Sequence, residues 1–128
     1  MNVVQQGREA MTHVKIDPDQ MSAAADAASQ LLKSLGSRHR LLILCQLTEA
    51  ERSVGDLAAA LGLRDSNVSQ HLSLMRRDGL VQARRDGQTI WYSITSAPAL
   101  RVLETLSDIF CPQAAPERCG RPADRKRR

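Results

Sequence analysis

The chain of 128 residues is poor in aromatic side chains, with one Phe, one Trp and one Tyr. A hydrophobic core must therefore come from Leu, Ala, Val and Ile, and the length suits one domain with a modest core. The longest strongly apolar run, "LLILC" at 41–45, falls well short of the roughly 18 residues that span a membrane. The N-terminus also lacks the basic and then apolar layout of a signal peptide, so we expect a cytoplasmic protein with no membrane partner.

Cysteine is scarce as well. Three cysteines in a cytoplasmic protein are more typical of reduced thiols than of a disulfide framework. The net charge of +4 comes entirely from residues 112–128, which leaves the rest of the chain neutral. We predict that this Pro- and Arg-rich tail is disordered, and that it is either a solubilising end or a non-specific phosphate-binding arm.

Apolar residues recur at helical spacing in the first part of the chain. A first helix is predicted from Asp17 and Pro18, as N-cap and first residue, to about residue 34, with Gly36 ending it. A second helix over about 38–47 is apolar around most of its circumference and should be central. The first helix carries a narrow seam of small apolar residues that lets another helix approach closely: Met21, Ala24, Ala25, Ala28, Leu31, Leu32 and Leu35.

Two shorter helices follow, separated by a glycine. Ser53 and Asp56 form a capping-box pattern at the start of the first, and Gly62 ends it. The second is predicted over residues 65–77, with Gly79 at its C-terminal cap. Their core-facing residues recur three and four positions apart: Val54, Leu57, Ala58 and Leu61 in one helix, and Val68, Leu72 and Met75 in the other.

The next segment predicts a β-hairpin. "LVQARRDGQTIWYSI" contains two strand-like runs joined by Asp86-Gly87, a strong hairpin sequence. A last apolar-striped helix is expected over about 98–111, before Pro112 stops it. Two short helices with a tight glycine-bearing turn, followed by a hairpin, predict a mainly α fold with a small β-hairpin wing: a winged helix-turn-helix.

The helix predicted over 65–77 concentrates small hydroxyl and amide side chains on its outward face. These residues are middling helix formers, so the composition favours hydrogen bonding to a partner over helix stability. Gln and Asn suit adenine, Arg suits guanine, and basic residues nearby suit DNA phosphates. A solvated polar face is the alternative interpretation. The candidate DNA-binding residues are Ser66, Asn67, Gln70, His71, Ser73, Arg77, Arg84, Arg85 and Gln88.

Several sequence features together resemble one family of bacterial repressors. "LLKSLGSRHRLLILC", "SVGDLA", "NVSQHLSLMRRDGLV" and the wing "RRDGQTIWYSI" are similar to the ArsR/SmtB family over about residues 28–111. The resemblance implies a homodimer that packs through its first and last helices and binds double-stranded DNA at an inverted-repeat operator. The apolar stripes of both helices agree, because a small monomer could not bury them.

Many members of that family sense metals. The thiolate type carries cysteines at the start of the third helix, where this chain has Ser53, Val54 and Gly55. The other common type uses Asp and His on the last helix, which contains no His here. We therefore expect no metal and no cofactor. A metal site built from the three cysteines (Cys45, Cys111 and Cys119) stays open as an alternative.

Cys45 and Cys111 occupy the helix positions and the 66-residue separation that resemble the dithiol branch of the family, which senses reactive sulfur species. The resemblance implies that these two cysteines are the sensor thiols. Cys45 as an inert small hydrophobe and a Cys111–Cys119 pair are the competing interpretations. No Ser/His/Asp arrangement or phosphate loop indicates an enzyme, although two thiols superficially suit a thiol peroxidase.

We therefore predict three segments: a flexible N-terminal segment at 1–16, a winged helix-turn-helix domain at 17–111 and the basic tail at 112–128. The predicted function is a dimeric DNA-binding repressor that releases its operator when reactive sulfur bridges Cys45 and Cys111. The alternatives are a metal-responsive repressor, a general redox repressor that responds to peroxide or electrophiles, and a constitutive architectural DNA-binding protein with inert thiols.

Overall fold

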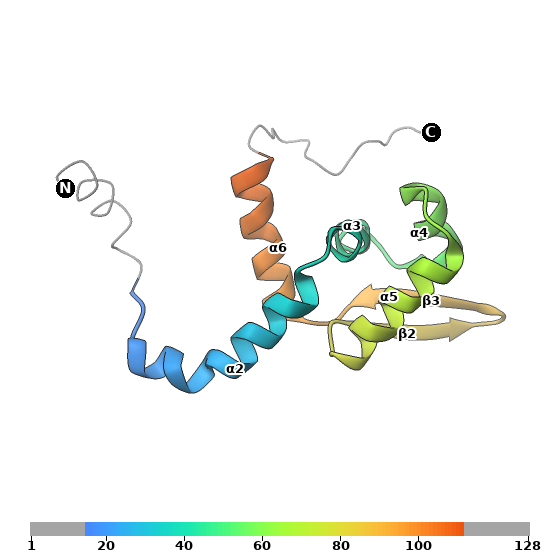
Figure 1. The fold of residues 1–128 in the computed structure, drawn as a ribbon. Helices are drawn as coiled ribbons and strands as arrows, with labels where there is room; N and C mark the ends of the chain where they lie inside the picture. The colour runs from blue at the N-terminus through green and yellow to red at the C-terminus, as the bar shows by residue number, and fades with distance from the viewer. Residues whose placement is uncertain (1–14, 112–128) are drawn as a thin grey trace. The chain divides into compact units, whose positions relative to one another are not determined.

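A computed structural model describes residues 15–111 of the chain. The chain divides into two units, residues 1–32 and 33–128. The predictions for residues 1–14 and for the tail, including Cys119, lie outside the described residues, and the domain boundaries stay a prediction. In chain order the elements are α2 (Pro18–Leu35), α3 (Arg38–Leu47), β1 (Arg52–Ser53), α4 (Val54–Leu61), α5 (Asp65–Arg77), β2 (Val81–Asp86), β3 (Thr89–Ile94) and α6 (Ala97–Phe110) (Figure 1).

Helix α2 begins where the sequence predicts. The Asp17 carboxylate accepts a hydrogen bond from the Asp19 backbone N–H at 2.9 Å, and Pro18 is the first helical residue. The seam is uncovered over most of its length, since Met21 is 46% and Leu32 61% exposed. The packing of another helix along this seam therefore stays a prediction.

The core of the second unit is aliphatic, as the scarcity of aromatics requires. Helix α3 packs against α4, α5 and β3, and its Ile43 and Leu44 are fully buried. The predicted inward face of α5 is confirmed, because Val68, Leu72 and Met75 are each 0% exposed. In α4 the expectation holds for Leu57 and Ala58 only. Val54 and Leu61, at the two ends of this short helix, are half-buried.

The predicted capping box of α4 is present. The Ser53 hydroxyl accepts from the Asp56 backbone N–H at 3.1 Å, and the Asp56 carboxylate accepts from the Ser53 backbone N–H at 3.4 Å. Gly62 ends the helix in the left-handed conformation with φ 69°, which a glycine adopts without a steric penalty. The start and the end of α4 are therefore both set by residues outside its apolar stripe.

Replacing Ser53 with Ala should lower the free energy of unfolding by about 1 kcal/mol, because the Asp56 backbone N–H loses the hydroxyl that accepts its hydrogen bond. Urea unfolding followed by circular dichroism measures this change. Ser22→Ala, at an exposed site inside α2, is the matched control and should change stability by less than about 0.5 kcal/mol. Equal effects of the two substitutions would show that the cap does not contribute.

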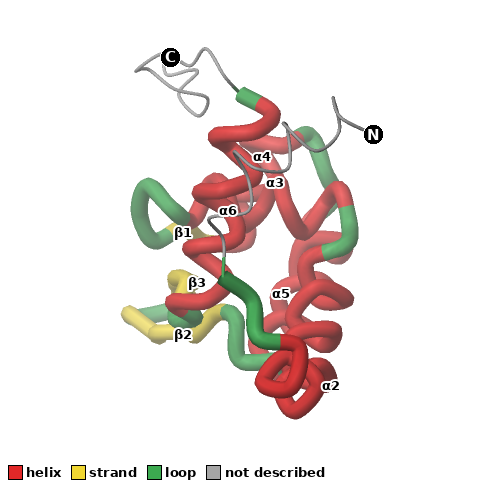
Figure 2. The backbone as a smooth tube through the Cα atoms, turned by 90° about the vertical axis from the view of Figure 1, so that its left-hand side faces the viewer, coloured by secondary structure: helices red, strands yellow, loops and turns green. Residues whose placement is uncertain are grey.

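The sheet contains one strand more than the sequence predicts. Strand order is β1-β3-β2 (Figure 2), and both pairings are antiparallel. Strand β1 has only two residues, too few to show an alternating pattern. The hairpin turn also lies one residue later than predicted, at Gly87 and Gln88, because Asp86 still pairs with Thr89. Gly87 has φ 68°, the positive angle that a tight hairpin turn requires.

Helix α6 starts at a Ser96 cap, whose hydroxyl accepts from the Ala99 N–H at 3.1 Å. It ends at Phe110, one residue before the predicted end. Only its first half is covered: Ala99 is 0% exposed, whereas Ile109 and Phe110 are 59% and 73% exposed. No helix within residues 15–111 is long and apolar enough to cross a membrane.

Candidate nucleic-acid interface

Helices α4 and α5 and the turn at residues 62–64 between them form a helix-turn-helix. The far end of α5 is joined to the wing through the main chain of Leu80. Its N–H donates to the Met75 carbonyl at 2.8 Å, and its carbonyl accepts from the Thr95 N–H at 2.9 Å. Gly79, with φ 80°, makes the sharp exit from the helix that this arrangement needs. Helix and wing are thus held together by backbone hydrogen bonds.

The outward face of α5 is exposed, as the sequence predicts. Ser66, Gln70 and Ser73 are solvent-exposed, and within residues 15–111 their side chains make no hydrogen bond. Arg77 lies on the same face and is also exposed, and its Nε donates to the neighbouring Asp78 at 3.3 Å. These four residues are defined here as the reading face. The polar groups of Ser66, Gln70 and Ser73 are available to a partner, as are the guanidinium N–H groups of Arg77 that do not bind Asp78.

Asn67 and His71 differ from the reading face, because both are half-buried on the flank of α5. The Asn67 Oδ1 atom is buried and accepts no hydrogen bond from residues 15–111. A bidentate contact with adenine uses both the oxygen and the nitrogen of an amide. In this conformation Asn67 cannot make that contact.

His71 contacts α3. Its Nδ1 accepts a hydrogen bond from Arg40 Nε at 3.3 Å, and its ring forms a T-shaped pair with the His39 ring, with the centroids 5.8 Å apart. Burial lowers the pKa of His71, and its electrostatic interactions with Arg40 and His39 lower it further. The ring is therefore neutral at pH 7, and its expected contact with DNA is a hydrogen bond and not an ion pair.

A second polar contact anchors the end of α5. The hydroxyl of Ser34, a buried residue, donates to Asp78 Oδ2 at 2.6 Å. This hydrogen bond, together with the one from Arg77, holds the pKa of Asp78 below its usual value. Asp78 thereby links Arg77 of the reading face to Ser34. The sequence separation of 44 residues hides this link from any local pattern.

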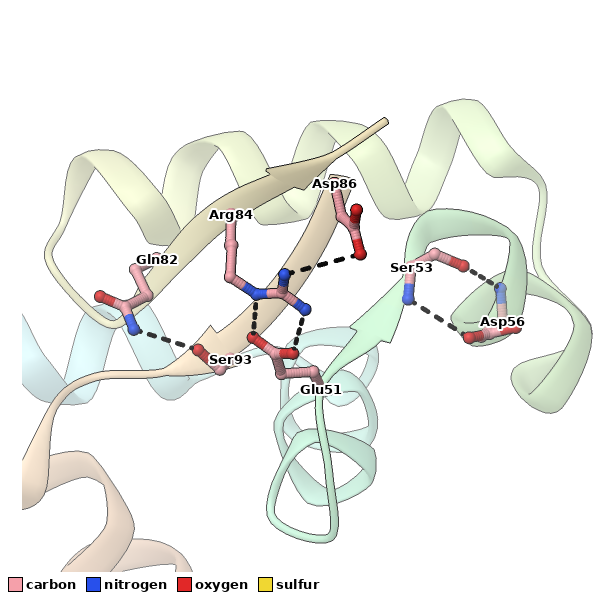
Figure 3. Close-up of polar contacts among 7 residues, drawn as sticks. All are labelled: Glu51, Ser53, Asp56, Gln82, Arg84, Asp86 and Ser93. Carbon is pink, nitrogen blue, oxygen red and sulfur yellow. Dashed lines mark hydrogen bonds and ion pairs between the residues drawn. The ribbon is translucent and has the colours of Figure 1, made fainter. Parts of the chain in front are cut away.

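The wing carries its two arginines on opposite faces. Arg84 donates to both carboxylate oxygens of Glu51, at 3.0 and 2.6 Å, and lies 3.9 Å from Asp86 (Figure 3). The hydrogen bonds from Arg84 lower the pKa of Glu51. By strand alternation Arg85 lies on the other face, with buried Val81, and it is exposed. Two nearby carboxylates, those of Glu51 and Asp86, therefore offset the charge of Arg84. The sequence analysis did not identify Glu51 as the partner of Arg84.

The two predicted sensor cysteines lie near helix ends. Cys45 is exposed in the last turn of α3, and its carbonyl accepts from the Thr48 hydroxyl at 2.6 Å. Cys111 is half-buried and caps the C-terminus of α6, next to the exposed Phe110. Within residues 15–111, no group of three or more His, Cys, Asp or Glu side chains is placed to hold a metal ion.

Comparisons with known proteins identify the family. The profile of the "Bacterial regulatory protein, arsR family" matches residues 37–83, which include α4 and α5. The transcriptional activator HlyU of Vibrio cholerae is 40% identical over 92 residues, which cover 72% of this chain and 85% of HlyU. A solved structure of reduced HlyU superposes with a TM-score of 0.68 and covers 72% of this chain and 97% of that one.

Two further solved structures agree. The transcriptional repressor BigR from Xylella fastidiosa is 36% identical with a TM-score of 0.72, covering 77% of this chain and all of BigR. A homodimeric winged helix-turn-helix DNA-binding domain from Mycobacterium bovis is 29% identical with a TM-score of 0.62, covering 75% of this chain and 89% of that one. These relatives are transcription regulators, not enzymes. The chain therefore belongs to the ArsR family of DNA-binding transcription regulators and has its winged helix-turn-helix fold.

Proposed function

We propose that the protein is a homodimeric repressor that places one α5 helix of each protomer in the major groove of an inverted-repeat operator. The observation that carries this proposal is the reading face, whose Ser66, Gln70 and Ser73 expose hydrogen-bonding groups that no other part of residues 15–111 uses. Two-fold symmetry then sets half-sites about 34–36 Å apart, or a multiple of that distance. Among the relatives, HlyU is named a transcriptional activator and BigR a transcriptional repressor, so repression by this protein is part of the proposal. A regulator of this kind acts at the chromosome, which places it in the cytoplasm.

The uncovered apolar surface supports the dimer. In the second unit Ile109 and Phe110 at the end of α6 are exposed, and in the first unit Met21 is exposed along the α2 seam. Exposed side chains of this size gain stability when a second copy covers them. The Mycobacterium bovis relative is described as homodimeric. Both helices are the ones that the sequence resemblance assigns to the dimer interface.

Contacts with DNA are divided by chemistry. The reading face contacts base edges, Asn67 and His71 lie beside it, and the wing contacts phosphates. Arg85 and Gln88 are exposed at the wing tip, whereas Arg84 has to leave Glu51 before it can pair with a phosphate. The proposed DNA-binding residues are thus Ser66, Gln70, His71, Ser73, Arg77, Arg84, Arg85 and Gln88, and Asn67 joins them once its amide has turned outward.

Arg85→Ala should weaken binding to every DNA sequence by a similar factor and reduce the slope of log affinity against log salt by about one, because one phosphate contact is lost. Arg84→Ala, the matched control on the neighbouring position of the same strand, should change the slope by less than about half of that amount, since Glu51 already neutralises this arginine. Fluorescence anisotropy at several salt concentrations measures both slopes. A larger slope change for Arg84→Ala than for Arg85→Ala would show that Arg84, and not Arg85, makes the phosphate contact.

Regulation is proposed to act through Cys45 and Cys111. Exposure of Cys45 allows a polysulfide to reach it, and Cys111 directly follows the uncovered end of α6. Helix α3, which carries Cys45, packs against α5, the helix with the reading face. A bridge from Cys45 to Cys111 therefore connects a neighbour of the reading helix to α6, the proposed dimer-forming helix. A tenfold loss of operator affinity needs only about 1.4 kcal/mol of difference between the two states.

The chemistry proceeds by thiol exchange. A cysteine thiolate forms an S–S bond with a sulfane sulfur of polysulfide, whose own S–S bond breaks, and a polysulfide anion shorter by one sulfur atom leaves. The second thiolate attacks the inner sulfur of this persulfide and expels hydrosulfide, which gives a disulfide. Alternatively, two persulfides condense to a trisulfide and release hydrogen sulfide. The cysteine sulfurs are oxidised and the displaced sulfur is reduced, so no other oxidant is needed.

Electrophoretic mobility of an operator fragment with the reduced protein tests the proposal. We expect a shift that polysulfide abolishes and dithiothreitol restores. A protein that ignores every oxidant would be a constitutive DNA-binding protein, and release by zinc or another metal ion would indicate a metal sensor. Release by peroxide as readily as by polysulfide would indicate a general redox regulator.

A further inference from the structure

We propose that Arg40 is a positioning residue for DNA recognition, which holds the His71 ring neutral with its proton on Nε2. Helix α5 then presents a fixed, uncharged donor on the flank of its reading face. The consequence for DNA rests on the function proposed above. The state of the ring does not, because it is measured without DNA.

The hydrogen bond itself defines the tautomer. Arginine has only donors, so the His71 Nδ1 that faces Arg40 Nε at 3.3 Å must be an unprotonated acceptor. A neutral imidazole with a free Nδ1 lone pair carries its proton on Nε2. Within residues 15–111 the ring has no other hydrogen-bond partner, so the Nε2 proton is available to an acceptor outside these residues.

Arg40 is fixed at a second point. Its Nη1 donates to the Ser34 carbonyl at 3.2 Å, while Ser34 itself donates to Asp78 at the end of α5. A guanidinium held at two points keeps its orientation with little further loss of side-chain entropy. Arg40 therefore presents Nε to the ring in one direction.

The charges around His71 also oppose its protonation. Arg40 and His39 face the ring from α3, and Asp78 lies near Arg40 at the end of α5. Protonation of the ring would place a second cation against Arg40 and break the hydrogen bond. The lowered pKa of His71 agrees with this geometry. Removing Arg40 should let the ring become charged as the pH falls. A charged ring then attracts one DNA phosphate.

Two measurements test the proposal. Imidazole nitrogen NMR of the free protein at about pH 7 should show the Nε2-protonated tautomer for His71. Operator affinity at fixed salt should be nearly constant for the wild type between about pH 8 and pH 6. For Arg40→Met it should rise over that range by up to about fivefold in about 0.15 M salt, because one added charge releases about one counterion while burial still lowers the pKa of His71.

Matched variants separate this role from a merely structural one. Arg38→Met removes an exposed arginine from the same helix and should leave affinity independent of pH, as in the wild type. Arg40→Lys keeps a cation beside the ring and should restore that independence. Adding His71→Gln to Arg40→Met should abolish the pH dependence, which excludes His39 as its source.

A proton on Nδ1, or a charged ring at neutral pH, would overturn the proposal even if the operator is bound normally. The same holds if Arg40→Met stays independent of pH. Conversely, the expected tautomer in a protein that binds no inverted repeat would leave the Arg40 assignment standing and refute the proposed function. If Arg40→Met does not fold, the wild-type spectrum and Arg40→Lys still decide.

Discussion

The Cys45→Ser and Cys111→Ser variants are expected to hold the operator in the presence of polysulfide, under conditions where wild-type affinity falls by about tenfold or more. Each substitution removes one of the two sulfur atoms that a bridge requires, while serine keeps a similar size. Cys45 is exposed, so its replacement should not disturb the core. Anisotropy titrations with and without polysulfide give the response ratio for each variant.

Intact-protein mass spectrometry identifies the bridge in the same samples. A trisulfide adds one sulfur atom and removes two hydrogens per protomer, a disulfide only removes two hydrogens, and both cysteine variants should stop at persulfides. A direct disulfide needs Cα atoms within about 7 Å, so a wider separation favours the trisulfide. Cys119→Ser is the control and should respond as the wild type. If Cys119→Ser holds DNA and Cys45→Ser releases it, the tail pair is the sensor.

Gln70→Ala should cost on the order of 1–3 kcal/mol at the cognate operator, roughly a fivefold to 150-fold loss of affinity. Gln70 lies near the centre of the exposed face of α5 and makes no hydrogen bond within residues 15–111, so its whole amide can contact a base. Affinity for scrambled DNA should barely change, because phosphate contacts carry that binding. The substitution should also relax the base preference at one position of each half-site.

Ser69→Ala serves as the control for Gln70, since Ser69 is exposed on the same helix but lies outside the reading face. It should bind cognate DNA with wild-type affinity. If Gln70→Ala binds both cognate and scrambled DNA with wild-type affinity, the base-contacting face lies elsewhere on α5.

Sequence patterns predicted the helices well because local residues determine their ends. The limits of α3 and α5 match the predicted ranges, and α4 begins at a capping box visible in the sequence. Strand β1 escaped prediction because a strand of two residues exists only through its pairing with Trp91 and Tyr92 of β3. The hairpin turn was placed one residue too early because pairing continues through Asp86.

The candidate interface was predictable in outline but not in detail. Helical periodicity identified the reading face, since the opposite face is uniformly apolar. It could not reveal that Glu51 pairs with Arg84 or that Arg40 binds His71, because these contacts join residues 33 and 31 positions apart. Such long-range pairs change which basic residues are available to DNA.

The main-chain hydrogen bonds of Leu80, which connect α5 to the wing, affect how easily such a regulator can acquire new DNA targets. Main-chain hydrogen bonds to Met75 and Thr95 connect helix and wing without using any side chain of the reading face. Ser66, Gln70 and Ser73 can therefore be exchanged at little cost to stability, since nothing within residues 15–111 depends on their polar groups. If these three residues contact base edges as proposed, drift at their positions would change which promoters a descendant controls while it keeps the ancestral architecture. Duplicated copies of such a gene could diverge into separate regulons through a few substitutions.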